Sequence, residues 1–222
     1  NVINNFYNGL AGHSSSIITG DLDTNDLTGV DLLWAVQPSN SYTGAELSSM
    51  SNYLAGGGRI AFMGEHASYA PSENARITAA IASLGGHISI DAVTEDGGFH
   101  DATVANGQIL THTLLDSVDT YNYAAFASLT LSGPAQALML GTNLTSVMMG
   151  FENIGPGSIF LITDQNVWDN VGSSSNDNAQ MFENLLLGVT GAPPVGVPEP
   201  ASLALLGLGL IGLRLAKKKN FV

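Results

Sequence analysis

The chain has 222 residues, 45% of them hydrophobic and 11% charged, a balance that excludes a disordered chain and fits one folded domain with an appendage. The segment before Val197 has 18 acidic residues and only two basic ones, Arg59 and Arg76. Its net charge of −16 excludes a nucleic-acid-binding role. The chain has no cysteine, which excludes disulfides, a thiol nucleophile and thiolate metal sites.

The first segment, residues 2–10, has a helix-like pattern, and an acidic loop follows it. This loop places oxygen ligands at alternate positions, as a calcium loop does: Asp21, Asp23, Asn25 and Asp26. The twelfth position, where a bidentate glutamate belongs, is Leu32, and the central glycine is missing. The simpler interpretation is an acidic loop that leads into the next strand.

A βαβ unit comes next. Residues 31–36 form a short apolar run typical of a buried strand. Thr43 is predicted to cap a helix that ends at residues 56–58, and one face of this helix carries Leu47, Met50, Tyr53 and Leu54. Residues 59–63 form the next strand, and the connection between the strands is long enough for parallel pairing.

The turn after this second strand carries the first candidate site. Residues 63–67 read Met-Gly-Glu-His-Ala, so Glu65 and His66 lie where the carboxyl ends of strands usually present ligand-facing groups. A carboxylate beside an imidazole can bind a metal or move protons. Adjacent residues on an extended segment point in opposite directions, so the alternative is a hydrogen-bonding or helix-capping role.

A third helix over residues 73–84 leads through two glycines into a strand at residues 87–90. The region over residues 102–150 differs, because it holds only short apolar segments at 124–131, 137–140 and 146–150. These segments predict antiparallel or edge strands that form a small β extension of the sheet.

Further candidate ligands lie in the loops around this region. His100, Asp101 and His112 can form a divalent-metal site with His66 if the fold brings them together. The alternative is that His112 is an ordinary loop histidine and that His100 is solvated. No phosphate-binding loop and no serine-hydrolase elbow occurs in the sequence.

The body ends with a buried strand and a helix. Residues 157–163 are a continuous apolar run, as expected of a central parallel strand. Residues 178–187 have helical spacing behind Asp177, a predicted N-cap. The alternation of strands and helices predicts an α/β fold over residues 1–190, with a mostly parallel sheet flanked by helices.

This body resembles the class I glutamine-amidotransferase-like superfamily, especially its non-catalytic, trehalose-utilisation-like branch. The resemblance rests on residues 27–33, 46–58, 59–65, 111–115 and 157–164. It implies a flavodoxin-like sheet with a first strand in its middle. No strand precedes residues 2–10, so we expect that the natural chain extends upstream, or that the sheet is a variant. The catalytic cysteine of the superfamily has no counterpart in residues 63–67, which excludes amidotransferase activity.

The C-terminal region has three parts in a fixed order. A Pro/Gly linker over residues 191–200 ends in Pro198-Glu199-Pro200, and residues 201–216 can form a hydrophobic helix about 24 Å long at 1.5 Å per residue. The predicted helical segment, residues 201–222, has a basic end that favours the cytoplasmic side: Arg214, Lys217, Lys218 and Lys219. A buried core helix is the alternative, but the leucines cover all of its faces.

This tail resembles the PEP-CTERM sorting signal of Gram-negative bacteria. The resemblance implies export, anchoring in the inner membrane through residues 201–216, and processing by an exosortase-type protease near the Pro-Glu-Pro. It also implies a final place at the cell surface or in the extracellular matrix, commonly in a producer of exopolysaccharide and biofilm.

Two functions remain open for the body. The first is a non-catalytic envelope or matrix protein that binds a glycan, such as exopolysaccharide, or another protein, without a cofactor. The second is a degenerate or metal-assisted hydrolase of sugar-related substrates that uses Glu65, His66, His100, Asp101 and His112. A permanently embedded single-span protein is a third interpretation, and it differs only in whether the tail stays attached.

Overall fold

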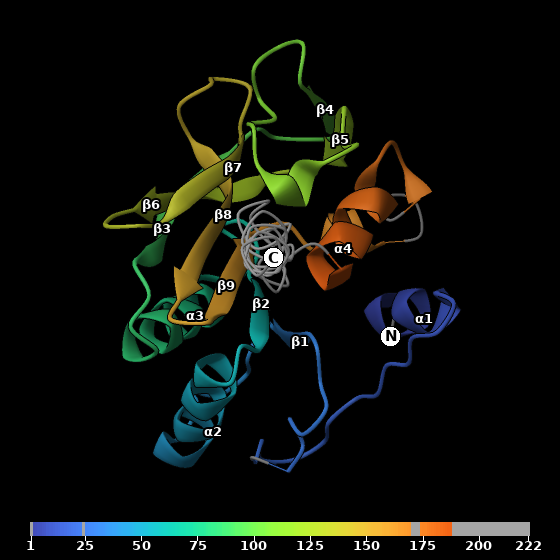
Figure 1. Ribbon diagram of the computed structural model, residues 1–222. Coiled ribbons are helices and arrows are strands. Elements are labelled where there is room, and N and C mark those ends of the chain that lie inside the picture. Colours follow the sequence, from blue (N-terminus) through green and yellow to red (C-terminus); the bar gives the residue numbers. More distant parts are fainter. Residues whose placement is uncertain (1, 24, 170–173, 188–222) are drawn as a thin grey trace, which may run out of the picture. The chain divides into compact units, whose positions relative to one another are not determined.

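The computed structural model describes residues 2–23, 25–169 and 174–187 (Figure 1). The chain divides into two compact units, Asn1–Val189 and Thr190–Val222, and all described residues belong to the first. None of the helices in these ranges is long and apolar enough to cross a membrane. The predicted linker over 191–200 and the predicted hydrophobic helix over 201–222 lie outside the described residues.

A mixed seven-stranded sheet forms the centre of the described body. Its strand order is β1-β2-β9-β8-β6-β3, and β7 pairs with β8 outside this path. The predicted α/β class is therefore confirmed.

One end of the sheet is parallel, as the sequence predicts. Strands β1 (Leu33–Val36), β2 (Arg59–Met63) and β9 (Gly157–Ile162) pair in parallel in that order, with Leu33 opposite Ile60 and Ile60 opposite Ile159. Every residue of β2 and β9 is buried. Continuous apolar runs suit this position because both faces of a parallel sheet are covered.

The other strands of the sheet pair antiparallel. They are β3 (Ile88–Glu95), β6 (Phe126–Leu131), β7 (Gln136–Leu140) and β8 (Val147–Ile154), and β8 also pairs antiparallel with β9. The connections from β6 to β9 are short, and only two residues, Gly155 and Pro156, join β8 to β9. Connections this short permit antiparallel pairing only, because a parallel partner requires a crossover.

The short segments of residues 102–150 form antiparallel strands of the sheet, as predicted, but they make up a larger part of it than a small extension. Three strands from this region, β6, β7 and β8, belong to the main sheet, where β6 and β8 are largely buried. Only β4 (His100–Thr103) and β5 (Thr120–Tyr123) form a separate two-stranded sheet. The strand predicted at 87–90 exists but continues to Glu95 and pairs antiparallel with β6.

The helices follow the sequence pattern closely. Helix α1 (Val2–Gly9) and α2 (Gly44–Ala55) begin where predicted, and Thr43 forms a complete capping box with Glu46. Helix α3 (Pro71–Ser83) begins two residues earlier than predicted, because a proline suits the first turn of a helix.

Helix α4 (Asn178–Leu187) also lies where predicted, directly after Asp177, whose carbonyl accepts from the N–H of Met181 and whose carboxylate has partners in another segment. That carboxylate accepts hydrogen bonds from the backbone N–H groups of Asp119 and Thr120 and from the Thr120 hydroxyl. Asp177 therefore ties the start of α4 to β5 through its side chain.

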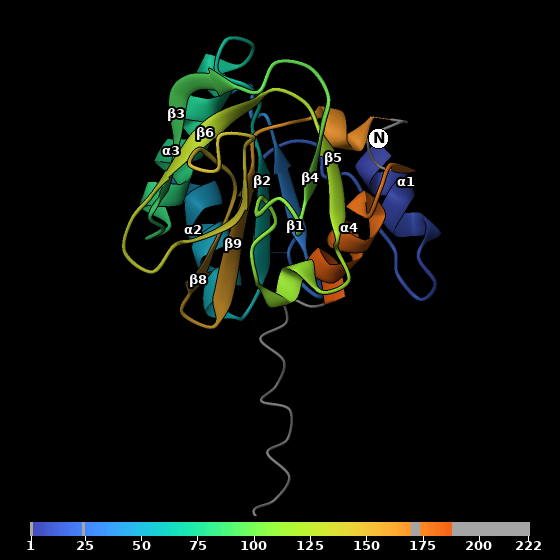
Figure 2. The ribbon, with the colours of Figure 1, turned by 90° about the horizontal axis from the view of Figure 1, so that it is seen from above.

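Two hydrophobic cores lie on the two faces of the sheet. Helices α2 and α3 cover one face, and α1 and α4 lie on the opposite side (Figure 2). The buried Arg59 of β2 donates to the carbonyls of Leu185 and Leu186 at the end of α4. The last carbonyls of a helix have no partner within the helix, so this guanidinium fastens the end of α4 to the sheet.

Candidate functional site at the carboxyl edge of the parallel strands

The carboxyl ends of β1, β2 and β9 meet at one edge of the sheet. Gln37 follows β1, Glu65 follows β2 after one glycine, and Asp164 and Gln165 follow β9. In open α/β sheets this edge is where ligands usually bind. The predicted position of Glu65 and His66 is thus reproduced, and the tertiary structure adds partners from the two neighbouring strands.

Glu65 is 1% exposed, and both of its carboxylate oxygens are engaged by the backbone. Oε1 accepts from the N–H of His66 at 2.8 Å, and Oε2 accepts from the N–H of Gln165 at 3.1 Å. Asn74 of α3 holds the Glu65 backbone through both its amide oxygen and its amide nitrogen. Burial raises the pKa of Glu65, although the two N–H donors favour the ionised form.

The residue before Glu65 has to be glycine. A Cβ atom on Gly64 would lie 2.4 Å from Oδ1 of Asn74, the atom that accepts from the Glu65 N–H. The sharp turn after β2 therefore depends on the missing side chain.

Asp164 is a second buried carboxylate at this edge, and its exposed fraction is 0%. Oδ2 accepts from the N–H of Ala124 at 2.6 Å, and Oδ1 accepts from the N–H of Asn166 at 2.8 Å. Burial, with the negative charge of Glu65 as a further cause, raises the pKa of Asp164 to about 6. The sequence identified Asp164 only as the end of a strand, because its partners lie in other segments.

Polar and aromatic groups surround the two carboxylates at the surface. The Gln37 amide donates to Oε1 of Gln165 at 2.9 Å, and Nδ1 of His66 lies 3.0 Å from the Ser68 hydroxyl. The ring of Tyr69 is 5.6 Å from that of His66, and this tyrosine is 64% exposed. The Thr94 hydroxyl accepts from the N–H of Ser68 at 3.2 Å. We call this set the carboxyl-edge surface: Gln37, His66, Ser68, Tyr69, Thr94 and Gln165.

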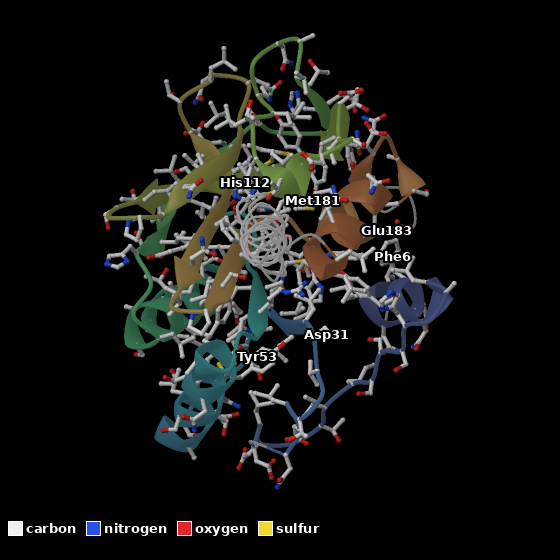
Figure 3. All side chains as sticks on the ribbon, in the orientation of Figure 1. Phe6, Asp31, Tyr53, His112, Met181 and Glu183 are labelled. Atoms are coloured by element: carbon white, nitrogen blue, oxygen red, sulfur yellow. The ribbon has the colours of Figure 1, made fainter. Side chains whose placement is uncertain are left out.

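The other predicted metal ligands lie elsewhere. Nδ1 of His112 accepts from the N–H of Leu114 and caps the short helix η1 (Thr113–Leu115), which agrees with an ordinary loop histidine (Figure 3). Burial lowers the pKa of His112. His100 contacts the carbonyl of Gly97, and the carboxylate of Asp101 accepts from the amides of Asn122 and Asn176.

These residues do not form a metal cluster with His66. Within residues 2–23, 25–169 and 174–187, no group of three or more His, Asp or Glu side chains is arranged to hold a metal ion. In the acidic loop, Asp23 Oδ1 accepts from the N–H of Asn25 and of Asp26, and Asp26 Oδ2 accepts from the N–H of Asp23. The carboxylates of Asp23 and Asp26 therefore hydrogen-bond the backbone of their own loop.

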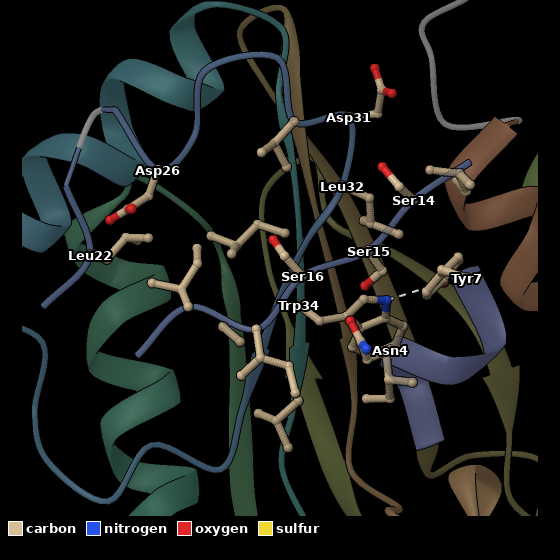
Figure 4. A pocket seen from close by; sticks show the side chains of 18 of the residues that line it. Asn4, Tyr7, Ser14, Ser15, Ser16, Leu22, Asp26, Asp31, Leu32 and Trp34 are labelled. Atoms are coloured by element: carbon tan, nitrogen blue, oxygen red, sulfur yellow. Dashed lines mark hydrogen bonds between the residues drawn. The ribbon is translucent and has the colours of Figure 1, made fainter. Parts of the chain in front are cut away.

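A large open cavity lies away from the buried carboxylates, along the outer side of β1. Its volume is about 910 Å³, and segments of residues 3–20, 22–36 and 42–50 contribute to its lining (Figure 4). Trp34 and Tyr7 form part of the wall, where the indole N–H donates to the tyrosine hydroxyl at 3.1 Å. Sequence reasoning missed this cavity, because its walls come from separate segments with no local motif.

Comparison with known proteins identifies the tail and the fold. Residues 196–219 match the PEP-CTERM protein-sorting motif, which contains all the predicted sorting residues. This signal directs export and membrane anchoring before processing, and its processing partner is an exosortase. No curated protein matches the chain.

Solved structures share the fold of the body at low sequence identity. The mmIFT52 N-terminal domain has a TM-score of 0.63 at 17% identity, over 79% of this chain and 84% of that one. Cytoplasmic protein STM3548 from Salmonella typhimurium has a TM-score of 0.57 at 12% identity, over 77% of this chain and 76% of that one. Cytoplasmic protein STM1381 from Salmonella typhimurium LT2 has a TM-score of 0.55 at 13% identity, over 75% of each chain. These likenesses concern the fold alone, and they do not confirm the predicted relation to amidotransferases.

Proposed function

Because the chain carries an exosortase sorting signal, we propose that its body is a non-catalytic module that binds neutral glycans at the cell surface or in the matrix. The binding site is the carboxyl-edge surface. The sorting motif supports the export that this proposal requires.

One observation carries the proposal: all four oxygens of Glu65 and Asp164 accept backbone N–H groups. Both side chains are almost fully buried, so their role is to hold the loops after β2 and β9 and the segment before β6. Carboxylates engaged in this way build a rigid support for neighbouring side chains.

The side chains on this support suit a neutral sugar. The exposed ring of Tyr69 offers an apolar face for the C–H groups of a pyranose, and the amides of Gln37 and Gln165 offer donors and acceptors for its hydroxyls. The acidic body repels anionic polysaccharides, since Arg59 and Arg76 are its only Lys or Arg residues before Val197.

The alternative, a hydrolase of sugar-related substrates, has one supporting observation. Two neighbouring carboxyl groups with raised pKa values are an arrangement used in acid–base catalysis, and the pKa of Asp164 is raised to about 6. Each oxygen already accepts a backbone N–H and is buried, so neither group is free to reach a glycosidic bond in this conformation. The binding function therefore fits the geometry better.

The test is glycan binding by the full chain in detergent, measured on an array of neutral oligosaccharides such as β-glucans and mannans. We expect Tyr69→Ala to weaken binding about tenfold or more, since 1.4 kcal/mol corresponds to a factor of ten. Phe99→Ala is the matched control, because Phe99 is 61% exposed and is not part of the carboxyl-edge surface. Equal effects of the two substitutions, or no glycan bound by the wild type, would refute the proposal. Release of reducing sugar, lost in Asp164→Asn, would favour the hydrolase.

A further inference from the structure

The free edge of β1 is the starting observation. β1 is the terminal strand of the sheet and pairs with β2 along one side only. The N–H of Gln37 donates to the carbonyl of Met63 in β2, and backbone groups alternate sides along a strand. The N–H and C=O groups of Trp34 and Val36 therefore point away from β2, and among the described residues no backbone group pairs with them.

This edge has its short length of four residues as a protection against strand addition, but no lysine, proline or bulge within the strand. Natural edge strands carry lysine, proline or a bulge that discourages pairing with another chain. β1 reads Leu-Trp-Ala-Val, and its pairing with β2 is regular over all four residues. Val36 is 41% exposed.

The cavity of about 910 Å³ runs along this same edge. Ile17 forms part of its lining and is 55% exposed, so two of the large exposed apolar side chains of the body, Ile17 and Val36, lie at one cavity. The cavity therefore lies beside the unpaired backbone groups of β1. Ile17 and Val36 can contact the side chains of an added strand that point into the cavity.

The charge of the cavity lining favours a basic ligand. Its lining includes Asp26, Asp31 and Glu46 but no lysine or arginine. The two arginines of the described body act elsewhere, since Arg59 bonds the carbonyls at the end of α4 and Arg76 bonds Glu73 and the carbonyl of Pro38. A basic partner therefore meets the carboxylates of Asp26 and Asp31, whereas Glu46 already accepts the N–H groups of Thr43 and Leu22. The charge of Asp31 also acts on Arg59.

One lining atom is an unsatisfied acceptor. Oδ1 of Asn4 is buried without a hydrogen-bond partner, and Asn4 lines the cavity (Figure 4). Buried polar atoms are usually paired, so this oxygen is an exception, and a donor in the cavity reaches it only if the Asn4 side chain turns toward the cavity.

We propose that the edge of β1 and the adjoining acidic cavity bind an extended, basic polypeptide segment of another protein, which adds to the sheet as an eighth strand. Backbone bonds to Trp34 and Val36 provide the register, Ile17 and Val36 provide apolar contacts, and Asp26 and Asp31 select basic side chains. This site is separate from the carboxyl-edge surface and does not depend on glycan binding.

The test uses the full chain in detergent and the labelled peptide acetyl-Lys-Val-Lys-Val-Lys-Val-Lys-amide, with binding followed by fluorescence anisotropy. One control peptide has glutamate in place of lysine, and the other carries methyl groups on the valine nitrogens and cannot complete a strand. We expect the Lys/Val peptide to bind at least about tenfold more tightly than either control. Added salt weakens this binding.

Variants and amide exchange locate the site. We expect the double variant Asp26→Asn/Asp31→Asn to weaken Lys/Val peptide binding about tenfold, whereas Asp116→Asn/Asp119→Asn, which removes the same charge outside the cavity, leaves it unchanged. We also expect NMR-detected exchange to be fast for the Trp34 and Val36 amides in the free chain and slow in the complex. Equal binding of the N-methylated peptide overturns strand addition. Trp34 and Val36 amides that are as protected as those of β2 in the free chain also overturn the proposal.

Discussion

Two buried carboxylates are the most consequential residues of the body. Glu65 and Asp164 are buried, no lysine or arginine within the described residues pairs with them, and backbone N–H donors compensate for their burial. Such donors stabilise the charged form but do not offset desolvation fully, which is why both pKa values are raised. Both groups therefore have a greater preference for a proton in the folded chain than in the unfolded chain.

This preference predicts a pH-dependent stability. The pKa of Asp164 is about 6 in the folded chain against 3.8 as its ordinary value, so the folded state binds this proton more tightly. The stabilisation is fully present below about pH 4 and is lost as the pH rises through 6. We expect Asp164 to make the wild type about 1–2 kcal/mol more stable at pH 5 than at pH 7, and Asp164→Asn to lose most of this difference.

Chemical denaturation of both proteins at pH 5 and pH 7 measures the effect. The lowered pKa of His112 acts in the opposite direction, because stability then rises as the pH rises through its ordinary value. His112 is present in both proteins, so the comparison between them isolates Asp164. An identical pH dependence in wild type and variant would show that Asp164 is not the group responsible.

At the scale of single residues, the sequence pointed to Glu65 but not to Asp164. Glu65 was recognisable because it follows an apolar strand within one turn. Asp164 was not recognisable as its neighbour, since the hydrogen bond that links the two turns joins Gln165 to Glu65 across 100 residues. His112 illustrates the converse, because its capping bond is local and an ordinary loop role could be proposed from the sequence.

At the scale of elements, the length of each connection decides how the strands pair. Long connections containing α2 and α3 follow β1 and β2, whereas turns of a few residues join β6, β7, β8 and β9. Strand propensity and apolar runs look alike in both halves of the sheet, so the extent of the antiparallel half was underestimated. The short turns themselves were the signal that could have corrected this prediction.

Close packing between elements predicts a strong effect at the start of β9. A Cβ atom on Gly157 would lie 2.5 Å from the carbonyl oxygen of Leu54 and 2.6 Å from that of Gly58. Both contacts are with backbone, so α2 and the start of β2 would have to move. We expect Gly157→Ala to lower the free energy of unfolding by about 3 kcal/mol.

Gly44→Ala is the matched control for this substitution. Gly44 is the first residue of α2, and a Cβ atom there meets nothing within 4 Å. Alanine favours a helix over glycine, so we expect this variant to be unchanged or stabilised by up to about 1 kcal/mol in urea denaturation. Equal stability of the two variants would mean that β9 packs less closely against α2 than described.

At the scale of the whole molecule, charge is divided between an acidic body and a basic tail. Four of the six basic residues fall in the last nine positions, inside or directly beside the sorting motif. The body thus has little attraction for anionic headgroups, whereas the tail supplies the basic end of the signal.

The motif predicts a change in mass on processing. In a host with an exosortase, we expect the mature protein to lack Lys217, Lys218 and Lys219, as measured by intact mass spectrometry. Replacement of Pro198, Glu199 and Pro200 by alanine should leave the tail attached, and Pro193→Ala/Pro194→Ala in the linker is the control. The same mass with and without the exosortase would indicate that the tail stays attached.

The sequence by itself determined the sorting tail, the α/β class, the parallel strands and the positions of the four helices. These features depend on local patterns: apolar runs, helical spacing, caps, and a motif of contiguous residues. Only the tertiary structure decided that Asp164 joins Glu65, that His100 and His112 lie apart from His66, and that a cavity opens beside β1. Each of these depends on which distant segments meet, and the hydrogen bonds and packing that settle this have no counterpart in the spacing of residues along the chain.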